Sequence, residues 1–124
     1  MIIKSIMIVD DSEADQFLTT MVIEEYNPAI KIIQAYDGQE ALEKLEEMVE
    51  KPCIIILDIN MPRMNGFEFL EEYNKKDYTV KIITMLTSSD QIHDREKALQ
   101  FKCVHGYSVK PLEVENLRKL IENT

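Results

Sequence analysis

Hydrophobic and polar residues follow one another along this 124-residue chain in two kinds of block. Short continuous apolar runs, such as Ile6–Val9 and Ile54–Leu57, are bounded by polar or turn-forming residues. Such runs are typical of strands buried on both faces of a parallel sheet. Between them lie longer segments in which apolar residues recur at helical spacing. The pattern therefore predicts alternating strands and helices.

Turn-forming and helix-capping residues give the approximate limits of these elements. The strands are expected over 6–9, 30–36, 54–57, 80–86 and 106–109. The helices are expected from Ser12 to Asn27, after Gly38 to Val49, from Gly66 to about Tyr73, from about Asp90 to Phe101 and after Pro111.

The first of these helices has an approximate capping signal in Ser12, three residues before Asp15, and ends at Asn27-Pro28. The fourth helix is the least amphipathic of the five. Apolar residues recur at helical spacing in the first helix at Ala14, Phe17, Leu18, Met21 and Val22.

Five strands alternating with five helices, joined by short connections, predict a doubly wound α/β domain with a five-stranded parallel sheet. A chain of 124 residues is long enough to bury one core and too short for a second. There are no repeats, low-complexity segments or linkers in the sequence. We therefore expect residues 1–124 to form one stand-alone domain, with the second strand at the edge of the sheet.

The chain is acidic, with 23 Asp and Glu against 14 Lys and Arg and a formal net charge of -9. This argues against direct nucleic-acid binding and suits a protein partner or a cation. No apolar run approaches the roughly 20 residues of a membrane span, and the first residues lack the layout of a signal peptide. We expect a cytoplasmic protein with no membrane contact. Cys53 and Cys103 are expected to be free buried thiols.

Candidate site residues follow the carboxyl ends of four predicted strands. In open α/β sheets these ends meet at one edge, where ligands bind. Taken singly, the acidic and hydroxyl residues could be helix caps and the lysine a solvated loop residue. Their shared position at one edge favours a site. The residues are Asp10 and Asp11 after the first strand, Asp58 and Asn60 at the third, Thr87 and Ser88 at the fourth, and Lys110 at the fifth.

Three carboxylates in one crevice, those of Asp10, Asp11 and Asp58, repel one another, and one would take up a proton unless a cation compensated it. Oxygen ligands without Cys or His select Mg²⁺ or Mn²⁺, and a site that retains waters fits Mg²⁺ best. Mg²⁺ with a hydroxyl and a lysine ammonium neutralises several oxygens at once, as a transferring phosphoryl group requires. The sequence thus predicts a magnesium-dependent phosphoryl-transfer site.

Four segments, in this order and each after a predicted strand, resemble the receiver domains of two-component response regulators, the CheY-like family. The resemblance covers the whole chain. It implies that Asp58 accepts a phosphoryl group from a phosphohistidine on a sensor histidine kinase or a histidine phosphotransfer protein. The four segments are Val9-Asp10-Asp11-Ser12, residues 57–66 (LDINMPRMNG), Leu86-Thr87-Ser88 and Tyr107-Ser108-Val109-Lys110-Pro111.

The resemblance also implies roles for the other residues. Asp11, Asp58 and the backbone carbonyl of Asn60 would bind Mg²⁺, with Asp10 assisting through water. Thr87 and Lys110 would hold phosphoryl oxygens, Tyr107 matches the family's aromatic switch residue, and the Lys110-Pro111 peptide would be cis. The segment 102–105 (KCVH) departs from the family pattern, which usually has Gly or Asn there. Cys103 would suit a left-handed helix end poorly.

The expected function is that of a single-domain response regulator, and not of a turnover enzyme. Phosphorylation would change a protein-binding surface on the last two helices and the strand between them, which a downstream effector protein would recognise. One alternative is a Mg²⁺ phosphohydrolase with Asp58 as nucleophile, but such enzymes need a second Asp where Asn60 stands. Another is a degenerate receiver that only binds proteins, which the intact set of Asp10, Asp11, Asp58, Thr87 and Lys110 argues against.

Overall fold

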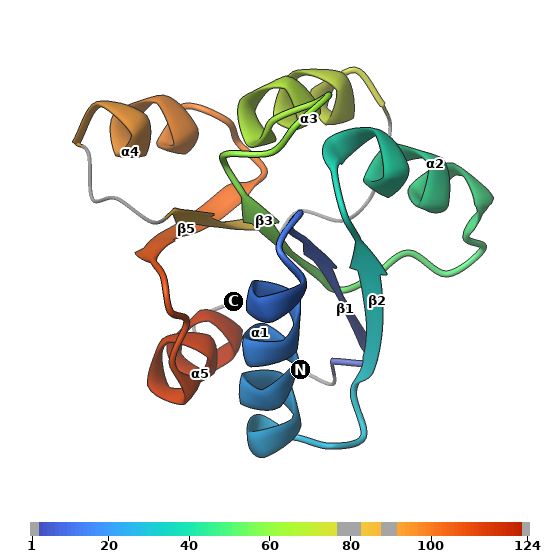
Figure 1. Ribbon diagram of the computed structural model, residues 1–124, viewed down its shortest axis with the longest axis vertical. Helices are drawn as coiled ribbons and strands as arrows, with labels where there is room; N and C mark the ends of the chain where they lie inside the picture. The colour runs from blue at the N-terminus through green and yellow to red at the C-terminus, as the bar shows by residue number, and fades with distance from the viewer. Residues whose placement is uncertain (1–2, 77–82, 88–91, 123–124) are drawn as a thin grey trace.

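Five parallel strands form one sheet in the part of the chain that the computed structural model describes (Figure 1). That part comprises residues 3–76, 83–87 and 92–122, with the backbone alone described for 83–87, 92 and 93. The elements are β1 (Ser5–Val9), α1 (Glu13–Tyr26), β2 (Lys31–Ala35), α2 (Gly38–Glu47), β3 (Ile54–Asp58), α3 (Gly66–Asn74), β4 (Ile83–Thr87), α4 (Ile92–Leu99), β5 (Val104–Val109) and α5 (Val114–Glu122).

The strand order is β2-β1-β3-β4-β5, and every pair of neighbours is parallel. This confirms the predicted doubly wound α/β class and the edge position of β2. The order reverses between β1 and β3, which places the carboxyl ends of these two strands at the point where doubly wound sheets bind their ligands. The register pairs Val9 with Leu57, so Asp10 and Asp58 follow at neighbouring positions on that edge.

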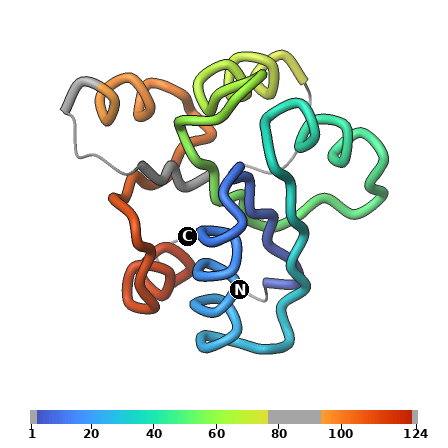
Figure 2. The backbone as a smooth tube through the Cα atoms, viewed as in Figure 1, coloured from blue at the N-terminus to red at the C-terminus, as the bar shows by residue number. Residues whose placement is uncertain are grey.

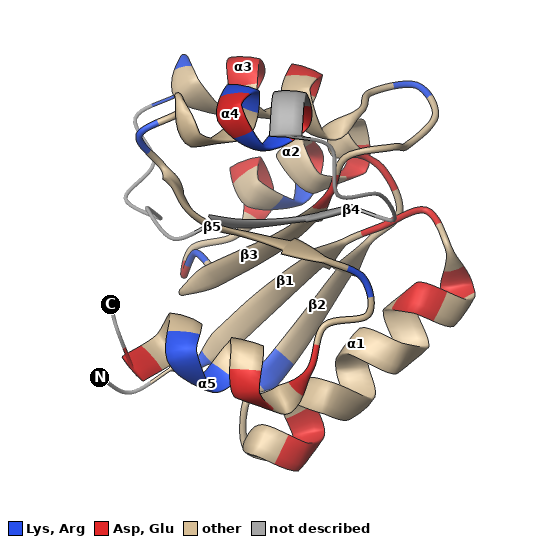
Figure 3. Ribbon diagram, turned by 90° about the vertical axis from the view of Figure 1, so that its left-hand side faces the viewer, with Lys and Arg blue, Asp and Glu red and all other residues tan. Residues whose placement is uncertain are grey.

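Helices cover both faces of the sheet, with α1 and α5 on one face and α2, α3 and α4 on the other (Figure 3). The apolar strand residues alternate between the two layers, as the period of two in a strand requires. Ile6, Ile8 and Ile56 belong to the core under α1 and α5, whereas Met7 and Leu57 belong to the core on the opposite face. The chain path in Figure 2 shows α1 and α5 side by side, and these two helices are in direct contact.

The helix α1 packs on the sheet through a face that excludes three of its predicted apolar positions, Phe17, Leu18 and Met21. The apolar side chains at positions 17, 18 and 21 are at least half exposed, while polar side chains lie underneath. Phe17 is 63% exposed, Leu18 50% and Met21 51%, and the buried residues of α1 are Gln16, Thr19 and Ile23. The helical spacing therefore predicted the helix correctly, but the buried stripe lies at positions 16, 19 and 23.

Some element ends differ from the predicted ones. The helix α2 ends at Glu47, so Val49 lies beyond it and is exposed. The strand β5 begins at Val104, two residues before its predicted start. Residues 80–82, predicted for the fourth strand, and residues 88–91, predicted for the connection after it and the start of the fourth helix, lie outside the described residues. Of the residues described, only Arg63 has a positive φ, so Cys103 does not adopt a left-handed conformation.

The two cysteines are free thiols, as predicted, and both are half-buried. Burial raises the pKa of the Cys103 thiol, against the opposing effect of a backbone hydrogen bond. Within the residues that the structure describes, no helix is both long enough and apolar enough to cross a membrane.

Candidate functional site

Three carboxylates meet at the carboxyl edge of the sheet. One oxygen from each of Asp10, Asp11 and Asp58 lies within 4.8 Å of the others. Asp10 directly follows β1 and Asp58 is the last residue of β3, and both are buried, whereas Asp11 is exposed. The structure thus brings together the three acidic residues that the sequence predicted for this edge.

The carboxylate of Asp58 lies in an environment that disfavours its negative charge. Burial raises its pKa to about 6, the negative charges of Asp10 and Asp11 act in the same direction, and Lys110 partly offsets them. A buried carboxylate beside two others is the environment in which a cation lowers the electrostatic free energy most. The donor set is oxygen alone, which fits Mg²⁺, and Asp10, Asp11 and Asp58 are the side chains that would hold it.

Lys110 reaches this cluster from the end of β5. Its Nζ lies 2.8 Å from Asp10 Oδ2, 2.7 Å from Asp15 Oδ2 and 3.3 Å from Asp58 Oδ1. Burial alone would lower the pKa of the ammonium, but the hydrogen bonds to Asp10 and Asp15 and the charge of Asp58 raise it. Lys110 is therefore a fixed positive charge at the site. The Lys110-Pro111 peptide is cis, as the family resemblance implied.

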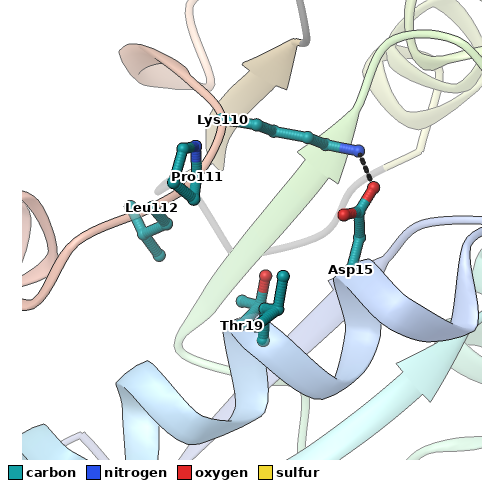
Figure 4. Close-up of a pocket in the computed structure, with 6 residues that line it drawn as sticks. Asp15, Thr19, Lys110, Pro111 and Leu112 are labelled. Carbon is teal, nitrogen blue, oxygen red and sulfur yellow. Dashed lines mark hydrogen bonds and ion pairs between the residues drawn. The ribbon is translucent and has the colours of Figure 1, made fainter.

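Asp15 is a member of the site that the sequence did not reveal. It lies in the first turn of α1, where its backbone N–H donates to Ser12 Oγ at 3.2 Å, which confirms the capping signal. Its carboxylate points to the ammonium of Lys110 (Figure 4). The available signal was its place one helical turn after Asp11, but nothing in the sequence separates it from an ordinary first-turn acid.

Gln16 is a second residue that the sequence did not single out. Its side chain is buried, and Nε2 lies 3.2 Å from the carbonyl oxygen of Ile8, 3.1 Å from that of Asp10 and 2.9 Å from that of Ala35. These carbonyls belong to the ends of β1 and β2. Gln16 therefore fixes the start of α1 against the backbone that carries Asp10, and it lies on the same buried face of α1 as Thr19 and Ile23.

The loop between β3 and α3 is held close to Asp58 by its backbone. The Gly66 N–H donates to the Ile59 carbonyl at 2.8 Å, and Asn65 forms a reciprocal capping box with Glu68 at the start of α3. A Cβ atom on Gly66 would lie 2.6 Å from the carbonyl oxygen of Asp58. This position requires glycine because the two backbone segments approach too closely for any side chain.

A second ion pair, between Asp37 and Arg63, lies on the same side of the site as this loop. Asp37 caps α2 by accepting from the Glu40 N–H at 2.8 Å, and its other oxygen accepts from Arg63 Nε at 2.8 Å and from Arg63 Nη2. Burial would raise the pKa of Asp37, but these hydrogen bonds and the guanidinium charge lower it. Arg63 itself has φ of 63°, in the left-handed region.

The structure describes the other predicted site residues only in part. Asn60 is exposed in the loop directly after β3. Thr87 ends β4 at the same edge, because Leu86 pairs with Asp58, but its side chain and all of Ser88 lie outside the described residues. Tyr107 pairs with Met85 and packs, half-buried, against the core beneath α2, α3 and α4.

A parallel sheet in the order β2-β1-β3-β4-β5, with an acidic cluster and a lysine at its carboxyl edge, is a doubly wound α/β domain with a candidate site at the point where the strand order reverses. The sequence matches the response regulator receiver domain family over residues 6–122, and the chain belongs to this family. It is similar to a two-component response regulator from Cytophaga hutchinsonii, with 31% identity and a TM-score of 0.91 over 99% of this chain and 97% of that one.

Curated relatives of different lengths are also similar. Protein PilH of Pseudomonas aeruginosa is 29% identical over 117 residues, which cover 94% of this chain and 93% of PilH. Protein-glutamate methylesterase/protein-glutamine glutaminase 2 of Koribacter versatilis is 32% identical over 113 residues, 90% of this chain. The chain spans 30% of the length of that longer relative.

Proposed function

We propose that this receiver domain accepts a phosphoryl group on Asp58 from a phosphohistidine of a sensor histidine kinase or a histidine phosphotransfer protein. One observation carries the proposal: Asp58 is a buried carboxylate at the end of a central strand, with Asp10 and Asp11 within 4.8 Å and the Lys110 ammonium at 3.3 Å. Asp10 has the same neighbours, but its Oδ1 already accepts the Ser12 N–H at 3.0 Å and its Oδ2 lies 2.8 Å from the Lys110 ammonium, so on this proposal Asp58 is the acceptor.

Each residue has a definite part in the transfer. An Asp58 carboxylate oxygen attacks phosphorus, the bond from phosphorus to the histidine nitrogen breaks with its electron pair on nitrogen, and an acyl phosphate forms. Asp10, Asp11, Asp58 and the Asn60 carbonyl would hold Mg²⁺, which when bound supplies charge neutralisation at the phosphoryl oxygens. Lys110 donates an N–H to one of those oxygens. Because the pKa of Asp58 is about 6, the nucleophilic carboxylate predominates at pH 7 even before a cation binds.

The response would pass from the site to the surface through β4 and β5. Thr87 would hold a phosphoryl oxygen; it pairs with Val109 of β5, which is two residues from Tyr107. Tyr107 would then change its packing. The altered surface on α4, β5 and α5 would bind an effector protein in the cytoplasm, without direct contact to nucleic acid or membrane. On this proposal the domain is a signalling protein and not a turnover enzyme.

Two alternatives have less support. A phosphohydrolase with Asp58 as nucleophile would need a second acid where the exposed Asn60 stands. A degenerate receiver would have no need of the buried carboxylates of Asp10 and Asp58 beside Lys110, an arrangement that is costly without a ligand.

Incubation with acetyl phosphate and Mg²⁺, followed by intact-mass analysis, tests the proposal. The wild-type protein is expected to gain one phosphoryl group and Asp58→Asn none. Asp37→Asn is the matched control, because Asp37 is also a buried carboxylate after a strand, and it should be labelled like the wild type. Labelling of Asp58→Asn at the wild-type rate would refute Asp58 as the acceptor.

A further inference from the structure

One of the two short contacts of Lys110 is with a carboxylate outside the acidic cluster, and the other is with Asp10 at 2.8 Å. Asp15 Oδ2 lies 2.7 Å from the ammonium, against 3.3 Å for Asp58 Oδ1, and Asp15 is not among the three clustered carboxylates. We propose that Asp15 is a positioning residue that holds the Lys110 ammonium on the α1 side of the site until Asp58 is phosphorylated, and thereby limits how readily the site accepts a phosphoryl group. This inference rests on the proposed function.

The hydrogen-bond capacity of Lys110 is the first step of the argument. An ammonium has three donors, and the three carboxylates of Asp10, Asp15 and Asp58 account for them. A phosphoryl group on Asp58 brings new acceptor oxygens, so one N–H has to leave a present partner. Asp10 and Asp58 are 3% and 6% exposed as side chains, whereas Asp15 is 35% exposed. Water can replace the ammonium at Asp15 at the lowest cost.

The surroundings of Asp15 support this exchange. Asp15 and Lys110 line an open cavity together with Leu18, Thr19, Pro111 and Leu112, so solvent reaches the ion pair (Figure 4). The first turn of α1 also stabilises a carboxylate that has lost its cation, because helix amino termini favour negative charge.

Asp15 itself is held in a fixed position. Ser12 caps its backbone N–H, and the neighbouring Gln16 is bound to three carbonyls of the strand ends. Asp15 is therefore a defined resting place for the ammonium, and not a mobile surface acid.

Removal of Asp15 should have opposite effects on two ligands. In Asp15→Asn the ammonium is left with Asp10 and Asp58, where it competes more strongly with Mg²⁺, so Mg²⁺ binding should weaken. A phosphoryl group no longer competes with Asp15 for Lys110, so a phosphoryl mimic at saturating Mg²⁺ should bind more tightly. Damage to the fold would weaken both.

The experiment compares Asp15→Asn with Glu13→Gln, which removes the same charge from the first turn of α1. Calorimetric titration gives the affinity for Mg²⁺ alone and for beryllium fluoride at saturating Mg²⁺, and thermal unfolding confirms that each variant is folded. For Asp15→Asn we expect beryllium fluoride to bind about five-fold more tightly and Mg²⁺ about three-fold more weakly, the scale of one partly exposed ion pair. Glu13→Gln should change both by less than about two-fold. Asp15→Glu, which keeps the charge, should return both affinities toward the wild type.

Acetyl phosphate labelling separates this inference from the proposed function. If the wild type is labelled at Asp58 and Asp15→Asn is labelled several-fold faster, the inference is supported. If the wild type is labelled and Asp15→Asn binds beryllium fluoride no more tightly, or Glu13→Gln has an equal effect, the inference is overturned while the proposed function stands. If the wild type is labelled elsewhere than Asp58, both fail.

Discussion

The two sides of the acidic centre each contain a carboxylate paired with a cation, but with opposite exposure. On the α2–α3 side the carboxylate of Asp37 is buried, with 9% of its side chain exposed, and the Arg63 side chain is 66% exposed. On the α1 side the cation is the more buried partner, with Lys110 at 17% and Asp15 at 35%.

We infer from this difference that the pair of Asp37 and Arg63 is structural, whereas the pair of Asp15 and Lys110 can exchange partners. Asp37 caps α2 and stays satisfied by the Glu40 N–H when Arg63 moves away, so it maintains the fold. Lys110 is shared among three carboxylates, and it can transfer a donor to a new ligand without leaving the site. The α2–α3 side therefore holds the geometry of Asp58, and the α1 side responds to what binds there.

The largest effect on stability is expected on the α2–α3 side, for Gly66→Ala. The added Cβ would meet backbone atoms, 2.6 Å from Asp58 O and 2.9 Å from Ile59 Cα, so α3 would have to move. We expect a loss of about 1–3 kcal/mol in the free energy of unfolding and slower labelling by acetyl phosphate. Urea unfolding and intact-mass kinetics measure the two effects.

Gly38→Ala is the control for this substitution. Its Cβ would meet the flexible Met64 side chain, 2.8 Å from Cγ, and alanine is the better helix former at the start of α2. It should cost less than Gly66→Ala. Equal costs would show that the close approach of Gly66 to the backbone of Asp58 does not determine the stability of the α2–α3 side.

A second effect is expected at Asp58 itself, in metal-free buffer. Because its folded pKa is about 6 and its ordinary value 3.8, the folded state binds the proton more tightly, and stability falls as the pH rises through this window. Asp58→Asn should therefore be more stable than the wild type by on the order of 2 kcal/mol at pH 7. The advantage should vanish toward pH 4, and Mg²⁺ should reduce it at pH 7.

Urea unfolding of both proteins across this pH range checks the sign. For Asp37→Asn the pH dependence should be reversed, because the pKa of Asp37 is lowered and its stabilisation is lost as the pH falls through the ordinary Asp range. A wild type that gains stability between pH 4 and 6 relative to Asp58→Asn would contradict the raised pKa.

The sequence was sufficient for the strands and for the acidic cluster, for one physical reason. Apolar runs such as Ile54–Leu57 can be buried on both faces only in a parallel sheet, and the ends of parallel strands share an edge. The positions of Asp10 and Asp58 at the ends of such runs, and of Lys110 after the last predicted strand, were therefore enough to predict that these three residues are neighbours.

The helix contacts were not predictable in the same way. The pair of Lys110 and Asp15 joins residues 95 positions apart, and it depends on how α1 sits on the sheet. The buried hydrogen bonds of Gln16 contribute to that placement, and a hydrophobic pattern does not reveal them. The contact of Asp37 with Arg63 depends likewise on a left-handed residue in a loop.

A third and smaller effect should distinguish the partners of the structural pair. Asp37→Ala removes the cap of α2 and should cost about 1–2 kcal/mol. Arg63→Ala removes only the exposed cation and should cost less than about 1 kcal/mol. Asp37→Asn keeps a capping oxygen, so its cost reports the ion pair alone. If Arg63→Ala proved as costly as Asp37→Ala, the stabilisation would not come mainly from the helix cap made by Asp37. The proposed difference between this pair and the pair of Lys110 and Asp15 would then be wrong.

The smallest effect is expected on the α1 side, for Phe17→Ala. Because Phe17 is 63% exposed, its truncation should change the free energy of unfolding by less than about 0.5 kcal/mol. Ile23→Ala is the control on the same helix, and it should cost about 2–5 kcal/mol because Ile23 is fully buried. Urea unfolding gives both values. A large cost for Phe17→Ala would mean that the face of α1 with Phe17 is buried, and a rotation of α1 that buried it would withdraw Gln16 from its three carbonyls and Asp15 from Lys110. A small cost would agree with an exposed Phe17 and with an orientation of α1 in which Gln16 and Asp15 keep their polar contacts on the α1 side of the site.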